Sequence, residues 1–130
     1  MIANSMTIKS HPRSLLDFMK RLKDDGVHII NSAVFHSGYL IGEDYFDYKL
    51  IDTEEPQHKA LAKWREDFFK ICAKYNIKPA EACVQFALMA PGVKSIALST
   101  SNPERVRHNI AMGAVRVPIC RSIAPATAFL

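Results

Sequence analysis

The stretch VKSIALSTSNPERVRHNI, residues 93–110, decides the fold. Its first six residues are short, largely apolar and preceded by Pro91-Gly92, which predicts a strand over residues 93–98. After a polar turn, Asn102-Pro103-Glu104 supply an N-cap, a proline at the first helical position and an acidic residue in the first turn. This pattern predicts a helix to about residue 112, with Val106 and Ile110 on its inner side. The stretch is therefore a β/α unit.

The turn of this unit has the features of an anion site. Helix N-termini bind phosphate through free N–H groups and the helix dipole, and an arginine one turn inside the helix adds a bidentate contact. Arg105 lies at such a position. The hydroxyl groups of the turn belong to Ser99, Thr100 and Ser101. The alternative is a capped helix with an ordinary surface arginine.

An earlier β/α unit has the same order. Residues 12–23 carry leucines and a methionine at helical spacing, and Gly26 is a natural C-terminal stop. VHIINSAVF, residues 27–35, follows as a short β-branched run, which predicts a strand that is buried on both faces. His36 comes directly after it, either as a surface residue or as a group that titrates near neutrality.

The segment between the two units divides into a loop and two helices. Residues 36–58 show no period, so they form either a surface loop or a lid that contacts a ligand. Apolar residues at helical spacing then predict a core-facing helix over residues 59–75, and Pro79 opens a second helix that runs to Met89.

Strands that alternate with helices predict an α/β fold built from parallel β/α units. Two strands alone would leave open edges and an unburied core, because a parallel sheet needs several strands and cover on both faces. We therefore interpret the chain as part of a larger α/β fold.

Composition excludes several classes of protein. The chain has 130 residues, a net charge of +4 without a run of like charges, and no apolar stretch long enough for a membrane span. We expect no nucleic-acid partner, no membrane partner and a cytoplasmic location. Three widely spaced cysteines and five histidines without ligand spacing indicate neither disulfides nor a metal site. No catalytic constellation is recognisable.

Two longer runs, GVHIINSAVFHSGYLIGEDYFDY and WREDFFKICAKYNIKPAEACVQFALMAPGVKSIALSTSNPERVRHNI, resemble the C-terminal half of an aldo-keto reductase. Within that superfamily the chain is most similar to the D-threo-aldose 1-dehydrogenase branch, over roughly residues 5–118. The resemblance implies the C-terminal portion of a (β/α)8 TIM barrel, about its last three β/α units, as an incomplete barrel. It also implies hydride transfer between NADP or NAD and an aldose or aldehyde.

The resemblance also assigns cofactor contacts. It places one set of residues along the cofactor's pyrophosphate and a second set around its adenosine part. The first set is Ala33, Phe35 and Ser37, and the second is Ser99, Thr100, Ser101, Arg105 and Asn109.

Three departures from the family pattern stand out. Ser32 takes the place of a tyrosine that stacks on nicotinamide, and no lysine lies near Ser99, so the choice between NAD and NADP stays open. The family's catalytic Asp, Tyr, Lys and His would all lie upstream of Met1, so no catalytic residue is assigned. The tail PICRSIAPATAFL lacks the usual closing helix, and we expect a truncated or frame-shifted gene product.

Two functions follow from the residues. The first is part of an NAD(P)-dependent aldo-keto reductase that is inactive alone, acting on a small sugar or aldehyde. The second is a non-catalytic half-barrel module that buries its open strand edges against a copy of itself or against a partner. A helix-turn-helix over residues 79–112 is disfavoured, because that motif joins its helices by a turn of three or four residues and the VKSIAL strand intervenes here.

Overall fold

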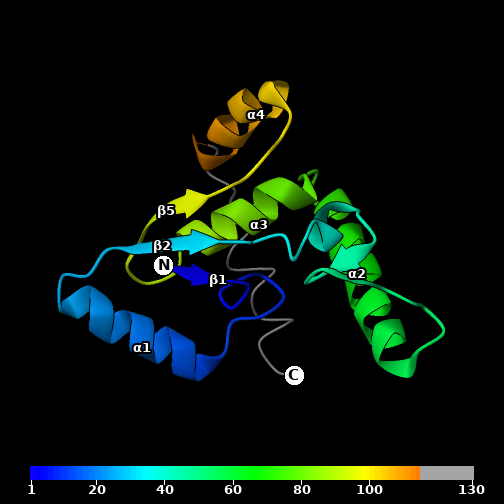
Figure 1. The fold of residues 1–130 in the computed structure, drawn as a ribbon, viewed down its shortest axis with the longest axis horizontal. Coiled ribbons are helices and arrows are strands. Elements are labelled where there is room, and N and C mark those ends of the chain that lie inside the picture. Colours follow the sequence, from blue (N-terminus) through cyan, green and yellow to red (C-terminus); the bar gives the residue numbers. More distant parts are fainter. Residues whose placement is uncertain (115–130) are drawn as a thin grey trace.

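A computed structural model describes residues 1–114 of the chain. At its centre is a parallel three-stranded sheet, ordered β1-β2-β5, formed by β1 (Ile2–Ala3), β2 (Ile29–Ser32) and β5 (Val93–Ala97) (Figure 1). Both pairings are parallel, as the alternation of strands and helices predicts. Strand β1 was not expected, because two residues carry no readable period and only pairing with β2 orders them.

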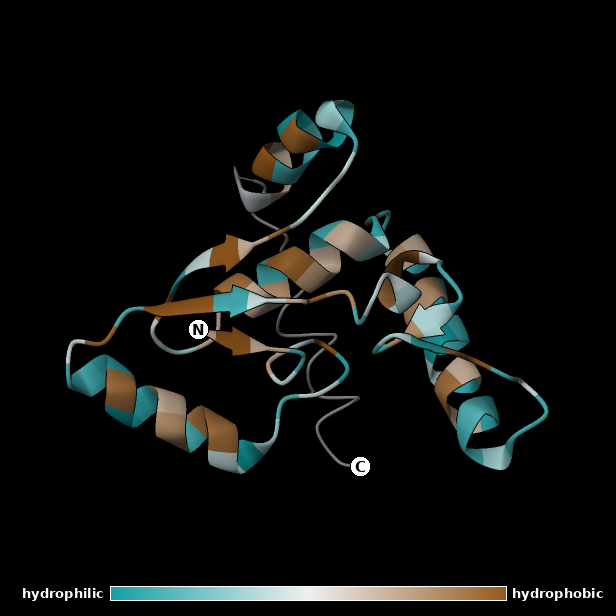
Figure 2. Ribbon diagram, in the orientation of Figure 1, coloured by the Kyte–Doolittle hydropathy of each residue, from teal (hydrophilic) through white to brown (hydrophobic). Residues whose placement is uncertain are grey.

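Four helices accompany the sheet. Their bounds are α1 (Arg13–Asp24), α2 (Pro56–Lys74), α3 (Pro79–Leu88) and α4 (Pro103–Ala114). Each carries hydrophobic and hydrophilic residues along its length (Figure 2). Gly26 follows α1 with a φ of 79°, the left-handed backbone that suits a glycine stop. All four helices were predicted, and α2 begins three residues earlier than expected, at Pro56.

The predicted loop over residues 36–58 contains regular structure. A short 3-10 helix, η1 (Tyr39–Ile41), is followed by an antiparallel hairpin of β3 (Tyr45–Phe46) and β4 (Lys49–Leu50). The two residues of the hairpin turn, Asp47 and Tyr48, have φ values of 47° and 68°. A two-residue hairpin turn with positive φ at both positions is of type I′, which usually selects Asn-Gly or Asp-Gly. Because Tyr48 stands where glycine is usual, the sequence did not indicate a hairpin turn here.

The core lies on one face of the sheet. Helices α1 and α3 contribute Met19 and Phe86 to it, and Ala90 follows α3. These residues pack with Ile29 and Val93 of the strands. A second cluster joins Val34, Val84, Ala87 and Met112, which links the segment after β2 to α3 and α4. The predicted inward residues of α3, namely Ala82, Cys83, Phe86 and Ala87, are all buried.

The other face of the sheet is uncovered within residues 1–114. Ile30 pairs with Ser95 and Ser32 pairs with Ala97, so these side chains share one face. Ile30 is 43% exposed, and Ser95 and Ala97 are exposed too. The prediction that the first strand is buried on both faces is therefore wrong for this part of the chain. The described residues form a parallel α/β sheet with helices, and no closed barrel.

Helix α4 differs from its predicted orientation. Val106 and Ile110, expected on its inner side, are 47% and 71% exposed, whereas Met112 is buried. The Gln85 side chain donates a hydrogen bond of 2.6 Å to the Met112 carbonyl, so the C-terminal end of α4 is attached to α3.

Of the helices described, none has the length and apolar character that crossing a membrane requires.

Candidate functional site

A cavity of about 610 Å³ lies where β2 and β5 end. The two strands are parallel neighbours, so their carboxyl ends meet at one edge of the sheet, the usual ligand position in parallel α/β folds. Residues 33–38, which we call the cavity loop, form one wall with every residue except His36, and residues 97–99 with Arg105 form another. Five of the eight cofactor residues that the resemblance assigns line this cavity: Ala33, Phe35, Ser37, Ser99 and Arg105.

The cavity loop has an unusual backbone. Ala33, His36 and Ser37 have φ values of 55°, 49° and 58°, in the left-handed region that residues with a Cβ atom rarely adopt. Gly38 follows at 92°, and a Cβ atom there would lie 2.5 Å from the Glu43 Cγ atom. The loop therefore coils tightly, with its N–H groups used in short turns such as Gly38 to the Phe35 carbonyl at 3.1 Å. Such backbone strain persists only where surrounding contacts hold it.

Arg105 supplies positive charge to the cavity. It lies in the first turn of α4, is exposed, and forms no ion pair within residues 1–114. The Asn102 side chain caps the same turn by accepting a hydrogen bond of 3.0 Å from the Glu104 N–H group. The predicted capped helix is therefore present, and its arginine lines the cavity.

The other three predicted residues lie elsewhere. The Thr100 hydroxyl accepts a hydrogen bond of 3.1 Å from the Asn102 N–H group, which ties it into its own turn. Thr100 and Asn109 line a separate groove of about 300 Å³ between α3, β5 and α4. Ser101 is exposed and lines neither hollow. The geometry thus brings together the pyrophosphate set and only part of the adenosine set.

The structure adds lining residues that sequence reasoning did not select. Four of them come from the segment that contains η1, Glu43 and the β3–β4 hairpin, because the hairpin folds back over the cavity loop. Tyr48 is 82% exposed and Tyr45 is 52% exposed. The tyrosine-rich run EDYFDY was a usable signal, since tyrosines in a loop after a strand are suited to ligand contact. These four residues are Ile41, Glu43, Tyr45 and Tyr48.

Arg65 on α2 anchors this wall. Its Nη1 group donates hydrogen bonds to the Glu43 carbonyl at 2.9 Å and the Tyr39 carbonyl at 3.5 Å. Its guanidinium also lies 4.0 Å from the centroid of the Tyr39 ring, within range of a cation–π interaction. Helix α2 therefore holds the η1 segment in place from outside the cavity.

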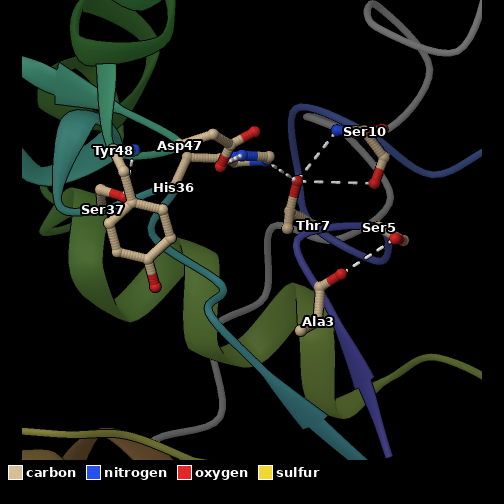
Figure 3. Close-up of polar contacts among 8 residues, drawn as sticks. All are labelled: Ala3, Ser5, Thr7, Ser10, His36, Ser37, Asp47 and Tyr48. Carbon is tan, nitrogen blue, oxygen red and sulfur yellow. Dashed lines mark hydrogen bonds and ion pairs between the residues drawn. The ribbon is translucent and has the colours of Figure 1, made fainter. Parts of the chain in front are cut away.

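His36 is buried, with only 2% of its surface exposed, so the first of its two alternatives, a surface residue, is wrong. Its Nε2 atom lies 2.8 Å from the Thr7 hydroxyl, and its Nδ1 atom lies 2.8 Å from an Asp47 carboxylate oxygen (Figure 3). The ring also stacks on Phe46 with 4.4 Å between centroids. Its partners lie 29 and 11 residues away, so no local pattern marks this burial.

The described cysteines have no reactive character. Cys72 and Cys83 are buried free thiols, as expected, and Cys120 lies outside the described residues. Burial raises the pKa of Cys72 to about 11, and burial together with the nearby Cys72 raises the pKa of Cys83 further. Within residues 1–114, no group of three histidine, cysteine or carboxylate side chains is placed to hold a metal ion.

Comparison with known proteins shows the family of the chain. The model of the aldo/keto reductase family matches residues 1–119. The chain belongs to this family. It is also 28% identical over 106 residues to the pyridoxal 4-dehydrogenase of Microbacterium luteolum. That match covers 78% of the chain and 29% of the relative, so the chain spans under a third of the relative's length.

Membership of the aldo/keto reductase family supports the resemblance stated above. The family fold is a TIM barrel, of which residues 1–114 present three parallel strands and their helices. The D-threo-aldose branch is a finer assignment than the family match makes.

Proposed function

We propose that the chain contributes part of the NAD(P) site of an aldo/keto reductase, at the cavity between the ends of β2 and β5. The observation that supports this most directly is the convergence of Arg105, Ser37 and Ser99 on one cavity at the edge of a parallel sheet. Arginine and hydroxyl groups are the side chains that bind phosphate oxygens.

The cavity has properties that a dinucleotide end requires. Its volume of about 610 Å³ falls within the range of small-molecule and cofactor sites. Apolar walls from Val34, Phe35 and Leu98 accompany the polar groups, and two tyrosine rings are available for stacking. Glu43 also lines the cavity, so the lining contains one basic and one acidic residue. A carboxylate accepts hydrogen bonds from ribose hydroxyls, which suits a nucleotide better than a free phosphate.

In this proposal each residue has a binding role. Arg105 neutralises phosphate charge, Ser37 and Ser99 donate to phosphate oxygens, and the backbone of the cavity loop shapes the wall. The nicotinamide cofactor, when bound, supplies a hydride that is exchanged with a carbonyl group. This chain's described residues bind and orient that cofactor, and we assign none of them a catalytic role.

We further propose an aldose or another small aldehyde as the substrate of the complete enzyme. The resemblance to D-threo-aldose 1-dehydrogenases supports an aldose, whereas the relative from Microbacterium luteolum is named for pyridoxal. Both are carbonyl compounds with several hydroxyl groups nearby. NAD and NADP both remain candidates for the cofactor.

A titration of the full chain with NADH and with NADPH tests the site. We expect binding that Arg105→Ala weakens on the order of tenfold or more, because a charge-assisted phosphate contact contributes about 1.5–3 kcal/mol. Arg107→Ala is the matched control, since Arg107 is an exposed arginine of the same helix that does not line the cavity. Equal affinity of the two variants, or no binding by the wild-type chain, would show that the proposal is wrong.

A second function is favoured by the uncovered sheet face. Within residues 1–114, β1 and β5 each pair on one side only, and Ile30 is 43% exposed between them. Open edges pair readily with another chain. A non-catalytic module of this kind would bury them against a second copy. Sedimentation of the chain tests this alternative, and a monomer at all concentrations would argue against it.

A further inference from the structure

We propose that His36 is a positioning residue that fastens the β3–β4 hairpin to the cavity loop and so fixes one wall of the cavity. The role is distinct from the family's cofactor contacts, because His36 does not line the cavity. It rests on the proposed function only in its consequence for nucleotide binding, while its effect on the hairpin stands on geometry alone.

The first step is the hydrogen-bonding state of the ring. A carboxylate only accepts hydrogen bonds, so the Nδ1 atom, 2.8 Å from Asp47, carries a proton and donates it. In the neutral ring the Nε2 atom then accepts a hydrogen bond from the Thr7 hydroxyl at 2.8 Å. One buried ring thereby connects the segment after β1, the cavity loop and the hairpin turn, as Figure 3 shows.

The second step is the backbone on either side of the Asp47 contact. His36 and Ser37 form one pair of left-handed residues, with φ values of 49° and 58°. Asp47 and Tyr48 form another, with φ values of 47° and 68°. The two pairs face each other and are joined twice, because the Tyr48 N–H group also donates to the Ser37 hydroxyl at 2.9 Å. Each strained turn is held by the other.

A nucleophilic triad is the competing interpretation of a Thr-His-Asp chain, and the surroundings of Thr7 exclude it for this conformation. The Thr7 side chain is fully buried and lines neither hollow described above. Its hydroxyl also accepts a hydrogen bond of 2.9 Å from the Ser10 N–H group. A hydroxyl fixed inside its own turn has no path to a substrate, so it serves as an anchor.

The link acts on the cavity through its neighbours. His36 is followed in the cavity loop by Ser37 and Gly38, and Asp47 is followed in the turn by Tyr48. These three following residues line the cavity. Phe46, which stacks on the His36 ring, also contacts the buried Tyr39 edge-to-face at 5.6 Å. Loss of the link would therefore release Tyr45 and Tyr48 from the wall without removing any group that touches a ligand.

Amide hydrogen exchange of the full chain tests the link directly. His36→Phe keeps a ring that stacks on Phe46 and removes both hydrogen bonds. We expect the amides of the hairpin, above all that of Tyr48, to exchange on the order of tenfold faster or more, with the amides of α3 unchanged. His28→Phe is the matched control, because His28 is exposed. Hairpin exchange at the wild-type rate would overturn the proposal.

Asp47 gives a second test that leaves the buried ring in place. The Asp47 side chain is 38% exposed, so Asp47→Ala breaks the contact from the outside even where His36→Phe does not fold. Asp47→Asn keeps an oxygen that accepts from Nδ1, and we expect it to restore hairpin protection to near the wild-type value. Equal exchange in the Ala and Asn variants would overturn the proposal, since a positioning role requires rescue.

NADH titration of the same variants separates this inference from the proposed function. We expect Asp47→Ala to weaken NADH binding several-fold and Asp47→Asn to retain it. Faster hairpin exchange in a chain that binds no NADH would support the link and reject the cofactor site. Unchanged exchange in a chain that binds NADH would reject the link and leave the cofactor site standing.

Discussion

Arg65→Met gives the sharpest test of how α2 holds the cavity wall. The substitution keeps an unbranched apolar chain against the core and removes the guanidinium, which makes two kinds of contact. The hydrogen bond to the Glu43 carbonyl at 2.9 Å is near-ideal in length, whereas the 3.5 Å contact to the Tyr39 carbonyl is too long to count fully. The position of the guanidinium 4.0 Å from the Tyr39 ring centroid adds a cation–π interaction.

The expected cost follows from these contacts. A hydrogen bond from a charged donor contributes about 1.5 kcal/mol at the lower end, which suits a half-exposed site. A cation–π interaction at such a site contributes about 0.5–1 kcal/mol. We therefore expect Arg65→Met to lower the free energy of unfolding by about 2 kcal/mol. Arg65→Lys retains one charged donor without the planar fork, so it should lose about half as much.

Urea unfolding followed by circular dichroism measures both variants. With a slope of about 1–3 kcal/mol per molar urea, the midpoint for Arg65→Met should fall by about 1 M. Arg107→Met is the control, because Arg107 is exposed and near the end of the described chain. Wild-type stability for Arg65→Met, or an equal loss for the control, would refute the assignment of Arg65 as the anchor of the η1 segment.

Two further predictions concern the pH dependence of stability and the steric contacts at a buried glycine position. Burial raises the pKa of Cys72 from 9.0 to about 11, so its contribution to stability is fully present below about pH 9 and lost as the pH rises toward 11. Urea unfolding between about pH 8 and pH 10.5 should show this loss, and Cys72→Ala should reduce it, while the buried Cys83, whose pKa is also raised, maintains the remainder. Gly92→Ala should destabilise the chain by about 1–2 kcal/mol, because φ is 74° and the new Cβ atom would lie 3.2 Å from Lys23 and 3.3 Å from Ile29. Gly26→Ala shares the positive φ and has open space, so thermal unfolding of the pair isolates the crowding.

The parts of the fold that the sequence predicted are those with a local cause. The helices have periodic apolar faces, and α4 has its capping residues in order, so each was recognisable alone. Strand β1 and the β3–β4 hairpin have no such cause. Ile2–Ala3 is a strand only because it pairs with Asn31 and Ser32, and the hairpin turns on Asp47 and Tyr48, whose strained backbone is held by the cavity loop.

The orientation of α4 is another feature that the sequence did not predict correctly. Its apolar residues at positions 106 and 110 predicted an inner face, but the buried residue of α4 is Met112, which lies two residues after Ile110 and on a different side of the helix. A short amphipathic pattern shows which residues share a face and does not fix which face is buried against a neighbour. The exposed residues instead border the groove between α3, β5 and α4.

Some features of the candidate site could likewise be predicted from the sequence, and others depend on contacts between distant segments. Because Ser32 pairs with Ala97 in parallel, the residues that follow each strand must emerge at one edge, which is why Phe35, Ser37 and Ser99 meet. That much follows from strand order alone. Which side chains face the cavity depends on hydrogen bonds within each turn, and Thr100 is removed from it because its hydroxyl binds the Asn102 N–H group. The wall formed by the β3–β4 hairpin depends on His36, whose hydrogen-bond partners come from two distant segments. The sheet therefore determines where the cavity lies, whereas its shape depends on contacts between segments that are far apart in the sequence.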